Sequence, residues 1–149
     1  MMPIGGRLSV SDTSYFYDAP VLLPVQPGKY SVMVRYGTSE GVKYVSALRV
    51  ARGDNLVRGS RMGDVLVDFA QVGVCDRDAV EKAFDSLGDT GMRIYYDQLQ
   101  TTDLVKTVTL PGNVEMIIAR SGFGDGNYPV YLLGASPQVP AGIEIDFER

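Results

Sequence analysis

The chain has 149 residues, of which 45% are hydrophobic and 21% are charged, and its formal net charge is -4. This length is typical of one ordinary domain that buries roughly 70% of its unfolded surface, so we expect a single globular domain over residues 1–149. The acidic balance argues against binding to nucleic acid or to an anionic membrane, because phosphate contacts need clustered lysine and arginine side chains.

Histidine and cysteine usage narrows the chemistry further. The chain has no histidine, so the commonest general base and transition-metal ligand is missing, and catalysis would have to use carboxylates, lysine, tyrosine or a hard metal. The single cysteine, Cys75, excludes an internal disulfide and fits a reducing compartment. The first residues have neither the basic region nor the apolar core of a signal peptide, and no segment is apolar for the length of a membrane span. We therefore expect a cytoplasmic protein.

Most of the chain is predicted to be extended. Runs of β-branched and aromatic residues, bounded by proline and glycine, predict strands at residues 7–10, 21–25, 29–36, 42–51, 65–74, 104–110, 114–120, 128–133 and 143–147. Residues 29–36 alternate between apolar and polar side chains, and we expect them to pair with residues 42–51 as an antiparallel hairpin. The polar segment 52–64 contains three glycines and predicts a loop.

One helix is predicted, from about Asp76 to Leu87. Asp76 is a favourable N-cap, Cys75 and Val80 can form a hydrophobic staple, and apolar residues recur at helical spacing until Gly88. Residues 92–98 are compatible with a strand or a helical turn, and their aromatic and β-branched side chains favour a strand.

These elements predict a mainly β or α+β fold, an antiparallel β-sandwich-like domain with one helix. Few of the predicted strands alternate with helices, so a parallel sheet is not expected. Pro129 falls inside a predicted strand, and we expect it at an edge or at a strand start because proline cannot donate to the ladder.

The segment Ser121-Gly-Phe-Gly-Asp-Gly-Asn-Tyr-Pro-Val-Tyr131 is the most informative motif. Glycine tolerates positive φ and close backbone approach, so the motif predicts a bend that presents its carboxylate. The candidate binding residues are Gly124, Asp125, Gly126, Asn127 and Tyr128. Two interpretations of Asp125 stay open: a structural turn in which the side chain accepts amide hydrogens, or a carboxylate that binds a ligand or takes part in catalysis.

Other aspartates sit at positions where a charge needs an explanation. The candidate catalytic carboxylates are Asp12, Asp68 and Asp125, and the candidates for a hard-metal site are Asp12, Asp68, Asp76 and Asp125. Asp68 interrupts an apolar run, where a charge is costly unless it is exposed or paired. The structural alternatives are a solvent-facing strand position for Asp68 and a helix cap for Asp76. The spacing of an EF-hand calcium loop is missing.

Three further groups have structural and functional interpretations. Cys75 lies between an apolar run and a helix start, so it is either a small buried apolar residue or a thiol activated by the helix dipole. Tyr15, Phe16 and Tyr17, like Tyr95 and Tyr96, fit core and edge packing, a partner surface or the lining of a pocket. The nearest approach to a basic cluster in the sequence consists of Arg49, Arg52, Arg58 and Arg61. It fits either a loop in solvent or a contact for an acidic partner.

The order of these segments resembles a bacterial and phage family, domain of unknown function 4241. The resemblance rests on Gly-Arg before Ser-Asp, Pro-Gly-x-Tyr, Val-Asp ahead of a second Asp, Tyr-Asp, Ser-Gly-Phe-Gly-Asp-Gly-x-Tyr-Pro-x-Tyr and Ile-Asp-Phe. These motifs are residues 6–12, 27–30, 67–76, 95–97, 121–131 and 145–147. Departures from the family pattern are Thr13 for proline, Phe69-Ala70 for Ser-Gly, and Cys75 for Phe. Because the family has no established activity, the resemblance implies domain boundaries and site candidates more than a function.

We therefore expect a soluble, non-enzymatic binding module with a protein partner and no cofactor. The family context adds the expectation of an inhibitor, an immunity-type protein or a phage accessory protein. The alternative is a hydrolytic enzyme that uses carboxylates or a hard metal such as Ca²⁺, Mg²⁺ or Mn²⁺ and is built on Asp12, Asp68, Asp76 and Asp125.

Overall fold

The computed structural model describes residues 2–14, 20–53, 57–134 and 140–148. The predicted aromatic group at residues 15–17 lies outside these ranges. In chain order the elements are β1 (Met2–Ile4), β2 (Arg7–Asp12), β3 (Val21–Pro24), β4 (Gly28–Ser39), β5 (Val42–Ala51), β6 (Arg58–Val67), β7 (Gln71–Asp76), α1 (Arg77–Leu99), β8 (Val105–Leu110), β9 (Val114–Arg120), β10 (Gly126–Leu133) and β11 (Gly142–Asp146).

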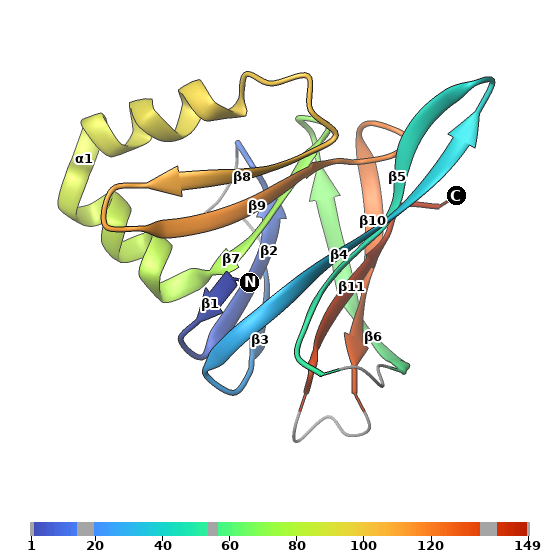
Figure 1. Cartoon of the computed structure of the whole chain (residues 1–149), viewed down its shortest axis with the longest axis horizontal. Coiled ribbons are helices and arrows are strands. Elements are labelled where there is room, and N and C mark those ends of the chain that lie inside the picture. The colour runs from blue at the N-terminus through green and yellow to red at the C-terminus, as the bar shows by residue number, and fades with distance from the viewer. Residues whose placement is uncertain (1, 15–19, 54–56, 135–139, 149) are drawn as a thin grey trace.

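The strands form two antiparallel sheets, which confirms the predicted fold class. The larger sheet has the order β1-β4-β5-β11-β10-β6, and the smaller has the order β3-β2-β7-β9-β8. The predicted hairpin of β4 and β5 is present, and its tip extends beyond the rest of its sheet (Figure 1). In the described part of the chain, no helix is both long and apolar enough to cross a membrane.

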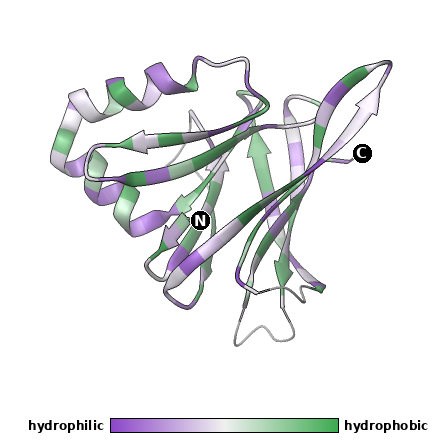
Figure 2. Ribbon diagram, in the orientation of Figure 1, coloured by the Kyte–Doolittle hydropathy of each residue, from purple (hydrophilic) through white to green (hydrophobic). Residues whose placement is uncertain are grey.

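Two apolar clusters hold three layers together. The first lies between the sheets, where alternate residues of each strand point inward; in β6, for example, Val65 and Val67 are buried while Leu66 is exposed. The second lies between the smaller sheet and α1, where Phe84 and Tyr95 pack on Met116 and Ile118 of β9. Figure 2 shows hydrophobic and hydrophilic residues alternating along the strands, as this layering requires.

The helix is longer than the sequence predicts. Gly88 has φ 55° and breaks the helical geometry where the predicted helix ends, but the chain turns there and continues as a second helical arm to Leu99 (Figure 1). The prediction of a strand around residues 94–97 was therefore wrong. Tyr95 is buried, its ring meets Phe84 edge to face, and its hydroxyl donates to the Thr13 carbonyl. Packing of this aromatic side chain outweighs its β propensity.

Three other expectations were wrong. The predicted loop 52–64 already contains the start of β6 at Arg58. The predicted strand 65–74 is divided by a turn at residues 68–70, after which the chain enters the other sheet. Pro129 lies in β10, between β6 and β11, and not at an edge. The pairing of β10 with β11 covers Val130 to Leu133, so Pro129, which has no amide hydrogen to donate, lies just outside it.

Candidate functional site

Asp12 lies at the end of β2 and is only 3% exposed. Its Oδ2 accepts the amide hydrogens of Asp68, at 2.6 Å, and of Phe69, at 2.8 Å. Its Oδ1 accepts the Ser14 amide at 2.7 Å. Charge-assisted bonds of this kind are short and strong, so both oxygens of the buried carboxylate hold backbone in place.

Asp125 holds the same turn from another segment. Its Oδ1 accepts the Ala70 amide at 2.9 Å, and the Ser121 amide donates to the Ala70 carbonyl at 3.0 Å. Residues 68–70, which we call the Phe69 turn, thus have three consecutive amides bonded to two carboxylates. Ala70 has φ 56°, a conformation in which an L-residue is strained.

The glycines of the 121–126 loop have different physical roles. A Cβ on Gly122 would lie 2.6 Å from the Val45 carbonyl oxygen and 2.9 Å from the Tyr44 ring, so this position has no room for a side chain. Gly124 has φ 78° and open space around it, so there the backbone angle favours glycine. The Gly124 carbonyl accepts a hydrogen bond from the Tyr128 hydroxyl at 2.8 Å. The loop is therefore braced between the β4–β5 hairpin and the Phe69 turn.

The structure separates the predicted aspartates. Asp12 and Asp125 meet at the Phe69 turn, where Asp68 contributes its amide while its side chain is exposed. Asp76 lies at the other end of β7; it occupies the N-cap position of α1 but makes no side-chain cap bond. Its Oδ2 instead accepts the Gly5 amide at 2.7 Å. Within the described ranges, no group of three or more Asp, Glu, Cys or His side chains is arranged to hold a metal ion.

The predicted binding residues at positions 124–128 span the end of the loop and the start of β10. Gly124 and Asp125 lie in the loop, Gly126 begins β10, and Asn127 is exposed opposite Leu66 on β6. Tyr128 is buried in the core, where its ring meets Phe147 edge to face. The exposed residues of the motif are therefore Phe123, Asp125 and Asn127.

Cys75 is buried, and burial raises the pKa of its thiol well above the ordinary value. A protonated, buried thiol fits the small apolar role that the sequence allowed and argues against an activated nucleophile.

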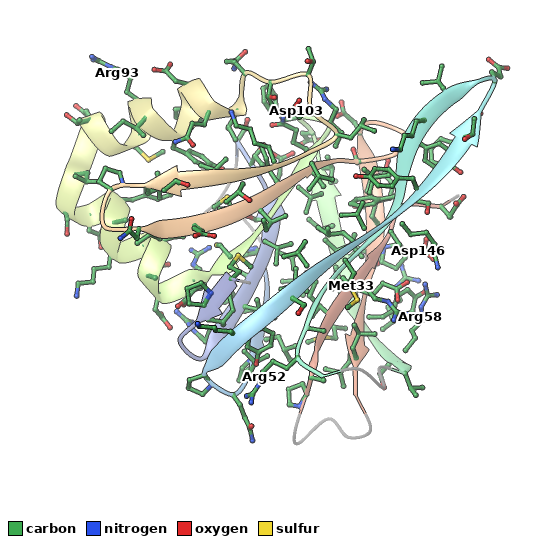
Figure 3. The ribbon with its side chains drawn as sticks, in the orientation of Figure 1. Met33, Arg52, Arg58, Arg93, Asp103 and Asp146 are labelled. Carbon is green, nitrogen blue, oxygen red and sulfur yellow. The ribbon has the colours of Figure 1, made fainter. Side chains whose placement is uncertain are left out.

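The basic side chains form ion pairs that the sequence does not reveal. The fully buried Glu144 of β11 accepts from Arg49, at 2.8 Å, and from Arg58, at 2.5 Å. Arg58 also lies 3.3 Å from Asp146, and Figure 3 shows the two side chains on the outer side of the larger sheet. Together with the Arg61–Asp64 pair, these contacts neutralise three of the four arginines of the basic cluster, while Arg52 donates to oxygens of Gln26 and Pro27.

A pocket of about 660 Å³ opens beside the Phe69 turn, where α1 ends. The helix-facing row of β9 is apolar at Met116 and Ile118 and becomes polar at Arg120. In the strand register, Arg120 lies opposite Gln71 of β7. Gln71 is 3% exposed and donates to the Leu99 carbonyl at 3.1 Å. The lining residues are Phe69, Gln71, Leu99, Gln100, Thr101, Thr102 and Arg120.

No sequence pattern predicts this pocket. Its only local signals are polar residues at the ends of strands, Gln71 at the start of β7 and Arg120 at the end of β9. Such residues also end ordinary strands, so the signal becomes specific only when the helix is placed above them.

Comparisons of the chain with family models, with curated proteins and with solved structures found no match. The resemblance to a known family therefore stays a prediction.

Proposed function

We propose that the chain is a non-enzymatic binding module that contacts a protein partner through the Phe69 turn and the pocket beside it. The observation that carries the proposal is the exposure of Phe69, 45%, on a turn whose consecutive amides are all held by carboxylates. An exposed aromatic ring on a rigid backbone loses little conformational entropy on binding, which is why such residues dominate protein interfaces.

The geometry supports recognition better than carboxylate catalysis. Asp12 is buried and both of its oxygens accept amide hydrogens. Asp125 accepts from Ala70. A general acid or base has to reach a substrate proton, and a buried carboxylate whose two oxygens both hold backbone amides, as those of Asp12 do, is poorly placed for that role. The enzymatic alternative stays a prediction without a supporting observation in the described residues.

The finer parts of the proposal come from the family resemblance and from composition. They are a cytoplasmic setting, a bacterial or phage origin, and a role as an inhibitor, an immunity-type protein or an accessory protein. A protein partner fits all of these roles.

The test is affinity capture followed by reconstitution. The immobilised chain and two variants, Phe69→Ala and Tyr36→Ala, are incubated with lysate of the source organism, and any recovered protein is purified and titrated by calorimetry. Tyr36 is a matched control because it is 44% exposed and lies on the β4–β5 hairpin. We expect a saturable complex that Phe69→Ala weakens at least tenfold and Tyr36→Ala leaves unchanged. A partner that binds Phe69→Ala undiminished, or no saturable partner at all, would overturn the proposal.

A further inference from the structure

Within the described residues, Arg120 has no carboxylate partner. Every other arginine there that is buried or half-buried forms an ion pair. Arg120 is half-buried at the end of β9, and a terminal nitrogen donates to the Thr101 carbonyl. Ion pairs within the same ranges engage Arg7, Arg49, Arg58, Arg61 and Arg77. A guanidinium carries five N–H donors, so Arg120 has donors left for a ligand in the pocket that it lines.

The neighbouring groups define what those donors meet. Thr102 lines the pocket, and Phe69 adds an aromatic side chain that is 45% exposed. Gln71 also reaches the pocket, but its carboxamide bonds the Leu99 carbonyl and the Thr13 hydroxyl. The pocket thus offers one cationic group and one apolar face.

We propose that this pocket binds a carboxylate that carries an apolar body, with the carboxylate on Arg120 and the apolar body on the Phe69 ring. A planar carboxylate matches the fork of guanidinium donors, and such pairs are commonly bidentate. The source of the carboxylate rests on the proposed function: it is an acidic side chain or the C-terminus of the partner. Net acidity of the chain does not oppose this, because a paired contact at close range outweighs distant charges screened beyond about 10 Å.

The first experiment uses a small probe and needs no partner. Benzoate and its neutral isostere benzamide are titrated into the ¹⁵N-labelled chain, and backbone amide shifts are followed. We expect benzoate to shift the amides of Phe69, Thr101 and Thr102 saturably, and benzamide to bind at least tenfold more weakly. Equal binding of the two probes, or shifts confined to other regions, would overturn the proposal.

Variants then test whether the Arg120 guanidinium is the group that binds the carboxylate. Arg120→Gln is expected to raise the benzoate Kd at least tenfold, while Arg93→Gln is expected to leave it unchanged, because Arg93 points outward from α1 (Figure 3). If Arg120→Gln loses its dispersed spectrum, Arg120→Lys replaces it; lysine keeps the charge but not the fork, so binding should weaken severalfold. Benzoate affinity that is indifferent to both variants would contradict the assignment.

Further probes identify the source. N-acetyl-phenylalanine presents a C-terminal carboxylate, and N-acetyl-Glu-Phe-amide presents a side-chain carboxylate. Whichever probe binds more tightly indicates which kind of carboxylate the partner contributes. Tighter binding of inorganic phosphate than of either would overturn the carboxylate assignment. A reconstituted partner that depends on Phe69 but not on Arg120 would refute this inference alone. Benzoate binding without any Phe69-dependent partner would refute the proposed function alone.

Discussion

Asp12 and Phe69 lie 57 positions apart in the sequence and are joined by a hydrogen bond of 2.8 Å from the Phe69 amide to Asp12 Oδ2. The same oxygen accepts the Asp68 amide, so a buried carboxylate at the end of β2 fixes the turn by which the chain crosses from one sheet to the other. A residue that the sequence offered as a catalytic candidate thereby has a structural role that positions an exposed aromatic ring.

Replacing Asp12 should therefore destabilise the fold. Asp12→Ala removes the acceptor of three amides and leaves them poorly paired near the core, so we expect the free energy of unfolding to fall by about 3 kcal/mol. Chemical denaturation measures this change. Asp68→Ala is the control, because its side chain is exposed and its amide is retained; its effect should stay within about 0.5 kcal/mol. Similar losses in both variants would refute the role assigned to Asp12.

Ala70 offers a stabilising substitution. Its φ of 56° brings an L-residue's Cβ close to the backbone carbonyl, a strain that glycine avoids. We expect Ala70→Gly to raise the free energy of unfolding by about 0.5 to 1 kcal/mol, after the entropic cost of glycine. Ala119→Gly, in the buried middle of the smaller sheet, should lower it by about 1 kcal/mol. Urea unfolding of both variants and the parent measures these free energies. A loss of stability in Ala70→Gly would contradict the strain argument.

Two glycines of the glycine-rich loop are required for different reasons, Gly122 because a side chain has no space and Gly124 because of its backbone angle. Gly122→Ala places a methyl group against the Val45 carbonyl oxygen, and we expect a loss of about 3 kcal/mol from overpacking. Gly124→Ala meets open space and only a strained φ, so its loss should be about 1 kcal/mol. Thermal and chemical denaturation of the pair test the order, and the account fails here if Gly124→Ala is the more damaging change.

The Arg7–Asp78 ion pair predicts a pH effect of defined sign. The Arg7 guanidinium, 2.6 Å from Asp78, holds the pKa of that carboxyl below its ordinary value. Between the folded and unfolded pKa values the unfolded chain binds more protons, so stability rises with pH across that window and is lost as pH falls through the folded pKa.

Asp78→Asn should reduce stability at neutral pH, and its difference from the parent should vanish at acidic pH. Urea unfolding over a pH series measures this difference, and added salt should shrink it because both side chains are exposed. Asp85→Asn, on the exposed side of α1, is the control and should show no such trend. A difference that grew on acidification would have the wrong sign.

Local patterns predicted the strands well because alternation and turn residues act over a few positions. The ranges 42–51 and 114–120 were predicted with the bounds that the structure shows. The second arm of α1 was missed because Gly88 is read as a stop, although its positive φ turns the chain and lets Tyr95 pack on Phe84.

The candidate site was predicted only in part, for a related reason. The sequence identified Asp12 and Asp125, but the amides that they hold in the Phe69 turn lie 55 to 57 positions away, and no local pattern encodes that convergence. Arg120 and Glu144 were missed because their meaning depends on which strands become neighbours. Long-range pairing, rather than propensity, decides where these polar groups meet.

Hydrogen exchange at the amides of residues 68–70 tests the central claim most directly. If Asp12 and Asp125 hold the turn that presents Phe69, these amides exchange slowly in the parent chain although the Phe69 side chain is exposed. Asp12→Asn should speed exchange at Asp68 and Phe69, Asp125→Asn should speed it at Ala70, and Asp68→Asn should change neither. Amides at this turn that already exchange in the parent at the rate of an unprotected loop would contradict the account.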